Sequence, residues 1–251
     1  MRPLYLLLTL VFLLSGFQGY AQKKFDEVQS SIYSGNNPQT MGYFEQFRSL
    51  IGTENISGNV TKNIKGSAYD NENFLKGTIV HEGKSYKNIW LRYNAYADEV
   101  EMKIHAPGDK DEEIHGFIKS PELSFVIGDE KVKYTEFLQK DKEEKSAGNV
   151  FVLYEGDHYS LYQRRVKIYK ESKEATTSFH RPFPARFVDD TEYYLKVEGQ
   201  TPVFVKPKLK SILSFVDNAK KSDVKNYIKK NDIDLKEGRG LAELMGYMDT
   251  L

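Results

Sequence analysis

The hydrophobic pattern of residues 66–205 has a period of two, and Gly-containing turns interrupt it at short intervals. In residues 99–104, for example, apolar side chains alternate with charged ones, as on a strand with one side in water. Turn sequences such as Glu82-Gly83 and Gly128-Asp129 separate roughly nine or ten such segments, which is typical of antiparallel barrels, rolls and sandwiches. Because no helical stretch lies between these strands to carry parallel crossovers, we expect an antiparallel rolled sheet or a partly closed barrel.

Helical periodicity is present on both sides of this β region. Residues 206–251 contain three amphipathic stripes, which predict a helical cap over one end of the sheet. Upstream, Asn37 is a suitable N-cap, Pro38 fits the first helical position, and an apolar stripe continues to Leu50 and Ile51. We therefore expect a mainly β chain, α+β overall, with an N-terminal arm and helix (22–65), an antiparallel β domain (66–205) and a C-terminal helical cap (206–251).

Residues 1–21 have the tripartite pattern of a secretory signal peptide. Arg2 precedes an apolar run over residues 4–15, and the small residues Gly19 and Ala21 occupy positions −3 and −1 of a cleavage site. The run is shorter than the roughly 20 residues of a membrane-spanning helix, although an uncleaved N-terminal anchor is the alternative interpretation. We expect an exported protein, periplasmic or extracellular, with no transmembrane segment after signal removal.

The chain contains no cysteine, which excludes disulfides, thiolate metal sites, a cysteine nucleophile and lipid attachment through cysteine. A chain of this length can bury enough apolar surface to be stable without disulfides, so their absence does not argue against export. Its 36 basic and 36 acidic side chains balance, and we therefore expect no nucleic-acid partner. The helical tail has a small surplus of positive charge, too weak by itself to indicate a membrane surface.

A particular succession of segments runs through residues 66–251. Leu91-Arg92-Tyr93-Asn94 leads into an acidic strand, Glu192-Tyr193-Tyr194-Leu195 follows, and the helical tail comes last. In this succession residues 66–251 resemble a group of uncharacterised secreted proteins of Bacteroidetes-type bacteria, most specifically over Leu91–Glu101. The resemblance implies a location in the bacterial envelope or outside the cell, and it implies no activity, cofactor or catalytic residue.

The same strand contains the strongest candidate for a ligand-binding surface. By alternation, Trp90, Arg92, Asn94 and Tyr96 share one face, where an aromatic platform with Arg and Asn donors could hold a glycan or an acidic group. The alternative is structural: Arg92 pairs with one of the acidic residues at positions 98, 99 and 101, and Asn94 caps the intervening turn.

Common enzyme signatures are missing, including a nucleophile elbow, a phosphate-binding loop, a dinucleotide fingerprint and a zinc-binding His-Glu-x-x-His motif. Two weaker arrangements could serve a hydrolase. Glu99 and Glu101 share a strand face about 6.5–7 Å apart, near the separation used by inverting glycosidases. The 105–115 loop places two histidines around acidic residues, although a lysine among them opposes a cation. We predict no metal and no cofactor, and the catalytic residues of any enzyme remain unknown.

The sequence therefore favours a non-enzymatic binding or structural module of the bacterial envelope, with a small apolar ligand, a glycan or an envelope protein as possible partners. The alternative is a hydrolase that uses Glu99 and Glu101 or the 105–115 loop. A third hypothesis is a peripheral subunit of a membrane complex that docks through the basic tail.

Overall fold

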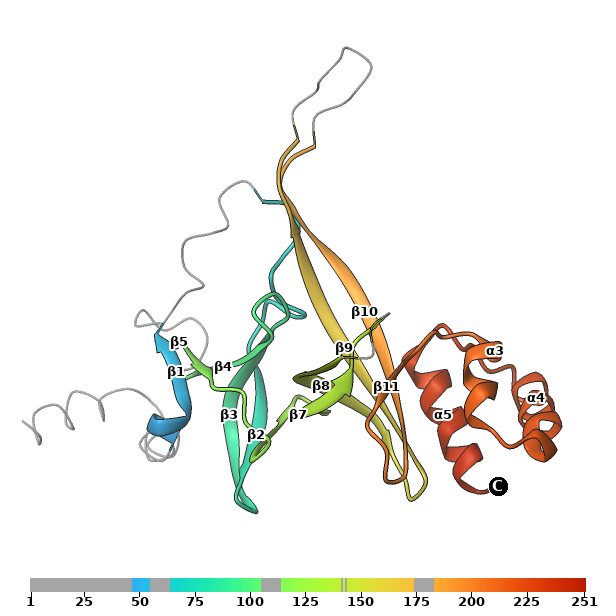
Figure 1. Ribbon diagram of the computed structural model, residues 1–251. Coiled ribbons are helices and arrows are strands. Elements are labelled where there is room, and N and C mark those ends of the chain that lie inside the picture. Colours follow the sequence, from blue (N-terminus) through green and yellow to red (C-terminus); the bar gives the residue numbers. More distant parts are fainter. Residues whose placement is uncertain (1–46, 55–63, 105–113, 141, 143, 174–182) are drawn as a thin grey trace, which may run out of the picture.

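The computed structural model describes residues 47–54, 64–104, 114–140, 142, 144–173 and 183–251 (Figure 1). The predicted signal peptide, the predicted start of the N-terminal helix at Asn37-Pro38 and residues 105–113 of the acidic loop lie outside this part of the chain.

Within the described residues, eleven strands form one sheet. The strands are β1 (Ile51–Glu54), β2 (Leu75–His81), β3 (Lys84–Asn94), β4 (Glu99–Lys103), β5 (Ile114–Phe117), β6 (Leu123–Ile127), β7 (Glu130–Leu138), β8 (Lys145–Glu155), β9 (Tyr159–Lys170), β10 (Arg186–Val197) and β11 (Val203–Val205). Their order is β1-β5-β4-β3-β2-β6-β7-β11-β10-β9-β8, and β7 also pairs with β8. The prediction of a mainly β, largely antiparallel chain is confirmed.

The Gly-containing turns expected from the sequence join consecutive strands. Gly83, Gly128 and Gly199 have positive φ values of 75°, 64° and 72°, a conformation that glycine adopts without a steric penalty. They connect β2 to β3, β6 to β7 and β10 to β11. The local signal of a glycine between two alternating segments therefore located these hairpins correctly.

Strands β7 to β11 form a ring-like region. Each of them pairs antiparallel with the next, and β11 then pairs with β7 through Val203 and Leu138. This last pair is parallel because closing an odd number of alternating strands brings two strands of the same direction together. The buried residues shared by these strands are Phe137, Val150, Tyr162 and Tyr194. A parallel pair thus arises without the helical crossover that a parallel α/β sheet would need.

Five short helical elements follow β11 and cover the outer face of the ring (Figure 1). They are α3 (Leu209–Ile212), η2 (Leu213–Phe215), η3 (Asn218–Lys220), α4 (Lys221–Lys230) and α5 (Gly238–Asp249). Leu241, Leu244 and Met245 of α5 are completely or almost completely buried against Leu161 and Leu195 of the sheet. The predicted C-terminal helical segment is therefore present, and its apolar stripes form a core of their own.

The N-terminal helix receives no support from the described residues. Phe47 is completely buried, but only a single 3-10 turn, η1 (Arg48–Leu50), follows before the chain enters β1. Assigning Ile51 to a helical stripe was wrong: Ile51 pairs with Phe117, and the N–H of Ile118 donates to the carbonyl of Leu50. The exposed edge of β5 accepts this segment as a strand, a tertiary effect that helical periodicity cannot detect.

The β9–β10 hairpin extends well beyond the rest of the sheet (Figure 1). Its two strands pair over twelve residues each, from Tyr159 and Val197 at the ring to Lys170 and Arg186 at the far end. We call the half beyond Val166 and Asp190 the arm, namely residues 167–173 and 183–189.

Candidate functional site

The four predicted binding residues do not form one continuous platform. Arg92 and Asn94 are buried on β3, whereas Trp90 is half-buried with the ammonium of Lys76 5.5 Å from its ring centre. Tyr96 lies beyond the end of β3, is 53% exposed, and contacts the ring of Phe187. The structure therefore joins Arg92 and Asn94 through Glu101, whereas the side chains of Trp90 and Tyr96 contact Lys76 and Phe187, respectively.

Arg92 is held by a charged partner and two aromatic rings. Its Nη2 and Nε donate to Oε2 of Glu101 at 2.6 and 3.1 Å, and its Nη1 donates to the carbonyl of Glu72 at 3.1 Å. The guanidinium carbon lies 3.5 Å from the ring centre of Tyr69 and 4.2 Å from that of Phe74. A delocalised, weakly hydrated cation is suited to this setting, where an ammonium would lose more hydration energy.

Asn94 connects the same carboxylate to the turn between β3 and β4. Its Nδ2 donates to Oε1 of Glu101 at 3.0 Å, while its Oδ1 accepts the N–H groups of Tyr96 and Ala97 at 3.2 and 3.0 Å. The structural alternative thus describes these contacts correctly, since Arg92 pairs with Glu101 and Asn94 caps the turn.

The two carboxylates proposed for a hydrolase share the expected face but differ in their surroundings. Glu101 is 3% exposed and accepts hydrogen bonds from Arg92 and Asn94. Burial raises the pKa of the half-buried Glu99, Lys119 opposes this effect, and the charges of Glu101 and Asp98 add to it. Among the described residues, no three His, Asp or Glu side chains gather as they would around a metal ion.

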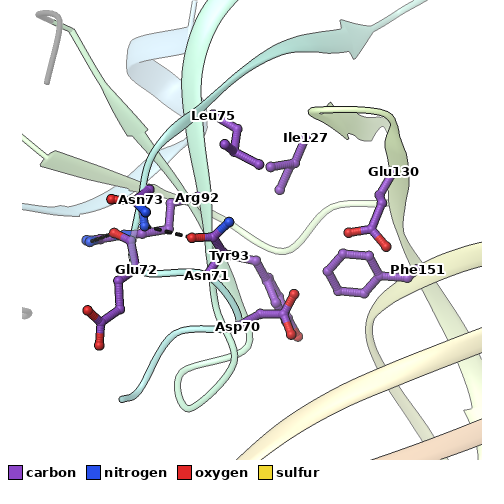
Figure 2. A pocket seen from close by; sticks show the side chains of 10 residues that line it. All are labelled: Asp70, Asn71, Glu72, Asn73, Leu75, Arg92, Tyr93, Ile127, Glu130 and Phe151. Atoms are coloured by element: carbon purple, nitrogen blue, oxygen red, sulfur yellow. Dashed lines mark hydrogen bonds between the residues drawn. The ribbon is translucent and has the colours of Figure 1, made fainter. Parts of the chain in front are cut away.

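A pocket of about 440 Å³ lies beside this cluster (Figure 2). It is lined by Asp70, Asn71, Glu72, Asn73, Leu75, Arg92, Tyr93, Ile127, Glu130 and Phe151. Leu75 and Ile127 lie at the top of the view, the carboxylate of Glu130 and the ring of Phe151 lie on the right, and the amide of Asn71 lies on the left beside Arg92 (Figure 2). The pocket therefore combines amides and carboxylates with an apolar wall, and its volume falls in the range of small-molecule sites.

Arg165 of β9 joins the segments that build this pocket. Its Nη1 donates to Asp70 at 2.7 Å and to Glu130 at 2.9 Å, and its Nη2 also donates to Glu130. Its guanidinium stacks 3.8 Å from the ring centre of Phe151. Burial alone would lower the pKa of Arg165, but hydrogen bonds and the charges of Glu130 and Asp70 outweigh it and raise that pKa. Arg165 thus holds the segment before β2 and the start of β7 in place against β9.

Sequence reasoning missed Arg165 because nothing local marks it. Its partner Asp70 is 95 residues away and Glu130 is 35 residues away. The neighbouring Arg164 points to the other face of the strand, where it pairs with Glu192 at 3.2 Å. Two adjacent arginines on one strand indicate one partner on each face of the sheet, but which residues these partners are depends on the register of distant strands.

Comparisons with protein-family models, with curated proteins and with solved structures found no match for the chain. Function therefore has to be inferred from its own residues. Within the described segments, no helix combines the length and apolar character that crossing a bilayer requires.

Proposed function

We propose that this is an exported, non-enzymatic binding protein of the bacterial envelope, and that its ligand is a glycan held in the pocket between Asp70 and Phe151. The observation that carries the proposal is the combination of amide, carboxylate and guanidinium groups with an apolar wall in one cavity. Export itself follows from the signal-peptide pattern of residues 1–21.

A sugar matches this combination because each hydroxyl both donates and accepts hydrogen bonds, while the ring carbons present an apolar face. Asp70 and Glu130 offer carboxylate acceptors, and Asn71 and Asn73 offer amides that can do either. Leu75, together with Ile127, provides a surface for the ring carbons. An apolar ligand would leave the polar groups without partners, and an acidic ligand would meet the carboxylates.

The same geometry argues against the hydrolase alternative. Glu99 and Glu101 do not line the pocket, and both oxygens of Glu101 accept hydrogen bonds from Arg92 and Asn94. Three carboxylates do line it: Asp70 and Glu130 accept hydrogen bonds from the guanidinium of Arg165, and Glu72 lies on the exposed segment before β2.

Binding can be tested by saturation-transfer NMR and calorimetry of residues 22–251 against a panel of neutral, amino and acidic oligosaccharides. We expect a neutral or amino glycan to bind, and Asn73→Ala to weaken it roughly five- to tenfold through a lost hydrogen bond. Asn73 is exposed, so its removal should leave the melting temperature unchanged. Asn226→Ala, an exposed Asn on α4 far from the pocket, is the matched control. Selective binding of acidic glycans, or equal losses in both variants, would contradict the proposal.

Export has a separate test. Expression of the full chain in a Gram-negative host should yield protein outside the cytoplasm that begins at Gln22, as read by intact mass. Material retained in the cytoplasm at full length would refute the export part of the proposal and leave the glycan test unaffected.

A further inference from the structure

Exposed apolar side chains concentrate on the arm. Among the described residues, seven large hydrophobic side chains are exposed, and four of them lie on the arm or against it. These four are Tyr96, Ile168, Tyr169 and Phe183. Phe187 ties part of the group together, with its ring centre 5.2 Å from that of Tyr96 and 5.6 Å from that of Tyr169. Single exposed hydrophobic residues are ordinary, but a group on one projecting element indicates an interaction site.

Among the described residues of the arm, basic side chains outnumber acidic ones. Nearer the ring, Lys167 pairs with Asp189. Farther out, Lys170, Lys173 and Arg186 face a single acidic residue, Glu171, and none of these three basic residues forms an ion pair with a described residue. The guanidinium of Arg186 lies 5.3 Å from the ring centre of Phe183, so charge and aromatic surface adjoin each other.

We propose that the arm docks on an anionic lipid surface, with its aromatic rings at the level of the headgroups and its basic side chains on lipid phosphates. Tyrosine is enriched at membrane interfaces because its ring is apolar and its hydroxyl is polar. Lysine and arginine extend their charged ends toward the headgroups while their stems remain in apolar contact. An anionic leaflet attracts basic segments within a Debye length of its surface.

The shape of the molecule favours this occupant over a protein partner. The described residues of the arm extend beyond the sheet and the helices (Figure 1). Apolar side chains occur on both faces of the hairpin: Ile168 and Val188 form one cross-strand pair, and Tyr169 and Phe187 form the next. Neighbouring pairs on a strand point to opposite faces, so apolar side chains on both faces suit an element surrounded by lipid headgroups more than one covered on a single side.

The docking proposal does not depend on the glycan pocket, and vesicle co-sedimentation of residues 22–251 tests it. Phosphatidylcholine vesicles with about 30% phosphatidylglycerol should bind the protein, phosphatidylcholine alone should bind it much more weakly, and salt should weaken the binding. Lys170→Gln with Lys173→Gln should lose about fivefold in affinity per charge removed. Tyr169→Ser with Phe183→Ser should lose roughly tenfold or more.

Two control variants have the same chemistry elsewhere. Ile118→Ser removes an exposed apolar side chain that is distant in sequence from the arm, and Lys229→Gln removes an exposed charge from α4. Both should bind as the unmodified protein does, and because all the altered side chains are exposed, every variant should keep its melting temperature. Equal binding to neutral and anionic vesicles, a larger loss in Lys229→Gln than in the arm variants, or self-association through Tyr169 and Phe183 without vesicle binding would overturn the proposal.

Discussion

Removing the positive charge of Arg92 should destabilise the protein strongly. Arg92 is 9% exposed and Glu101 only 3%, so Arg92→Ala takes the guanidinium away from an almost completely buried carboxylate, to which the amide of Asn94 still donates. Breaking a buried ion pair by deleting one partner costs about 3–5 kcal/mol. The lost stacking on Tyr69 and Phe74, each within 4.2 Å, acts in the same direction.

The expected change is large enough to measure by thermal unfolding. A loss of 1 kcal/mol lowers the melting temperature of a chain of this size by about 2–4 °C, so Arg92→Ala should melt roughly 6–20 °C lower. The only tryptophan, Trp90, lies on the same strand, and its fluorescence reports the unfolding of this part of the sheet. Lys87→Ala, an exposed change on the same strand, should shift the melt by little.

A double variant separates the cost of a buried carboxylate that lacks its guanidinium from the value of the ion pair. Arg92→Met with Glu101→Met replaces both charges with apolar groups of similar size and should recover most of the lost stability, because no buried carboxylate remains. If Arg92→Ala melts within about 2 °C of the unmodified protein, the reasoning is refuted. If it then also fails to bind glycan, Arg92 is a ligand contact instead of a structural ion pair.

Two further predictions concern pH and backbone packing. Burial raises the pKa of Glu99, so the folded state disfavours the ionised form of this side chain. Glu99→Gln should therefore raise the melting temperature at neutral pH. This gain should disappear as the pH falls below 4.5, the ordinary pKa of a glutamate, because Glu99 is then protonated in both the folded and the unfolded state. A gain that is independent of pH would contradict this. A Cβ on Gly77 would lie 2.2 Å from a backbone carbonyl oxygen of β6, so Gly77→Ala should destabilise the sheet by about 1–3 kcal/mol in denaturant titration. As a control, the Cβ of Gly246→Ala on α5 would meet its nearest neighbour at 3.6 Å, so this variant should stabilise the protein by up to about 1 kcal/mol. If both variants lose the same amount of stability, the close contact at Gly77 is not the cause.

The parts of the fold that sequence reasoning located correctly depend on short-range patterns. Alternation in residues 99–104 and the glycine at position 83 place strands and turns because side-chain direction and turn conformation are local properties. The pairing of Arg92 with an acidic residue across the next turn was also accessible, since a hairpin brings close together residues that are near each other along the chain. Which of the three acidic residues it chooses depends on the register, where Arg92 lies opposite Glu101.

The parts that were missed depend on contacts between distant segments. Nothing near Arg165 indicates Asp70 as its partner, and that contact helps to hold the segment before β2, which lines the pocket, against β9. Ile51 fits a helical stripe as well as a strand, and the edge of β5 decides between them. The parallel pair of β7 and β11 follows from the number of strands in the ring, which no single window of sequence contains.

The five strand pairs that close the ring of β7 to β11 differ in how extensively they are hydrogen-bonded. Four of its five junctions are antiparallel ladders between strands adjacent in sequence, whereas the fifth rests on the pair Val203–Leu138 and on the hydrogen bond from the N–H of Leu138 to the carbonyl of Pro202. Separating β7 from β11 would leave every hairpin intact and would still admit water to Phe137 and Tyr194. We therefore expect opening along this seam to cost less than opening any of the four antiparallel ladders, and amide exchange at Leu138 should report a local opening less costly than global unfolding.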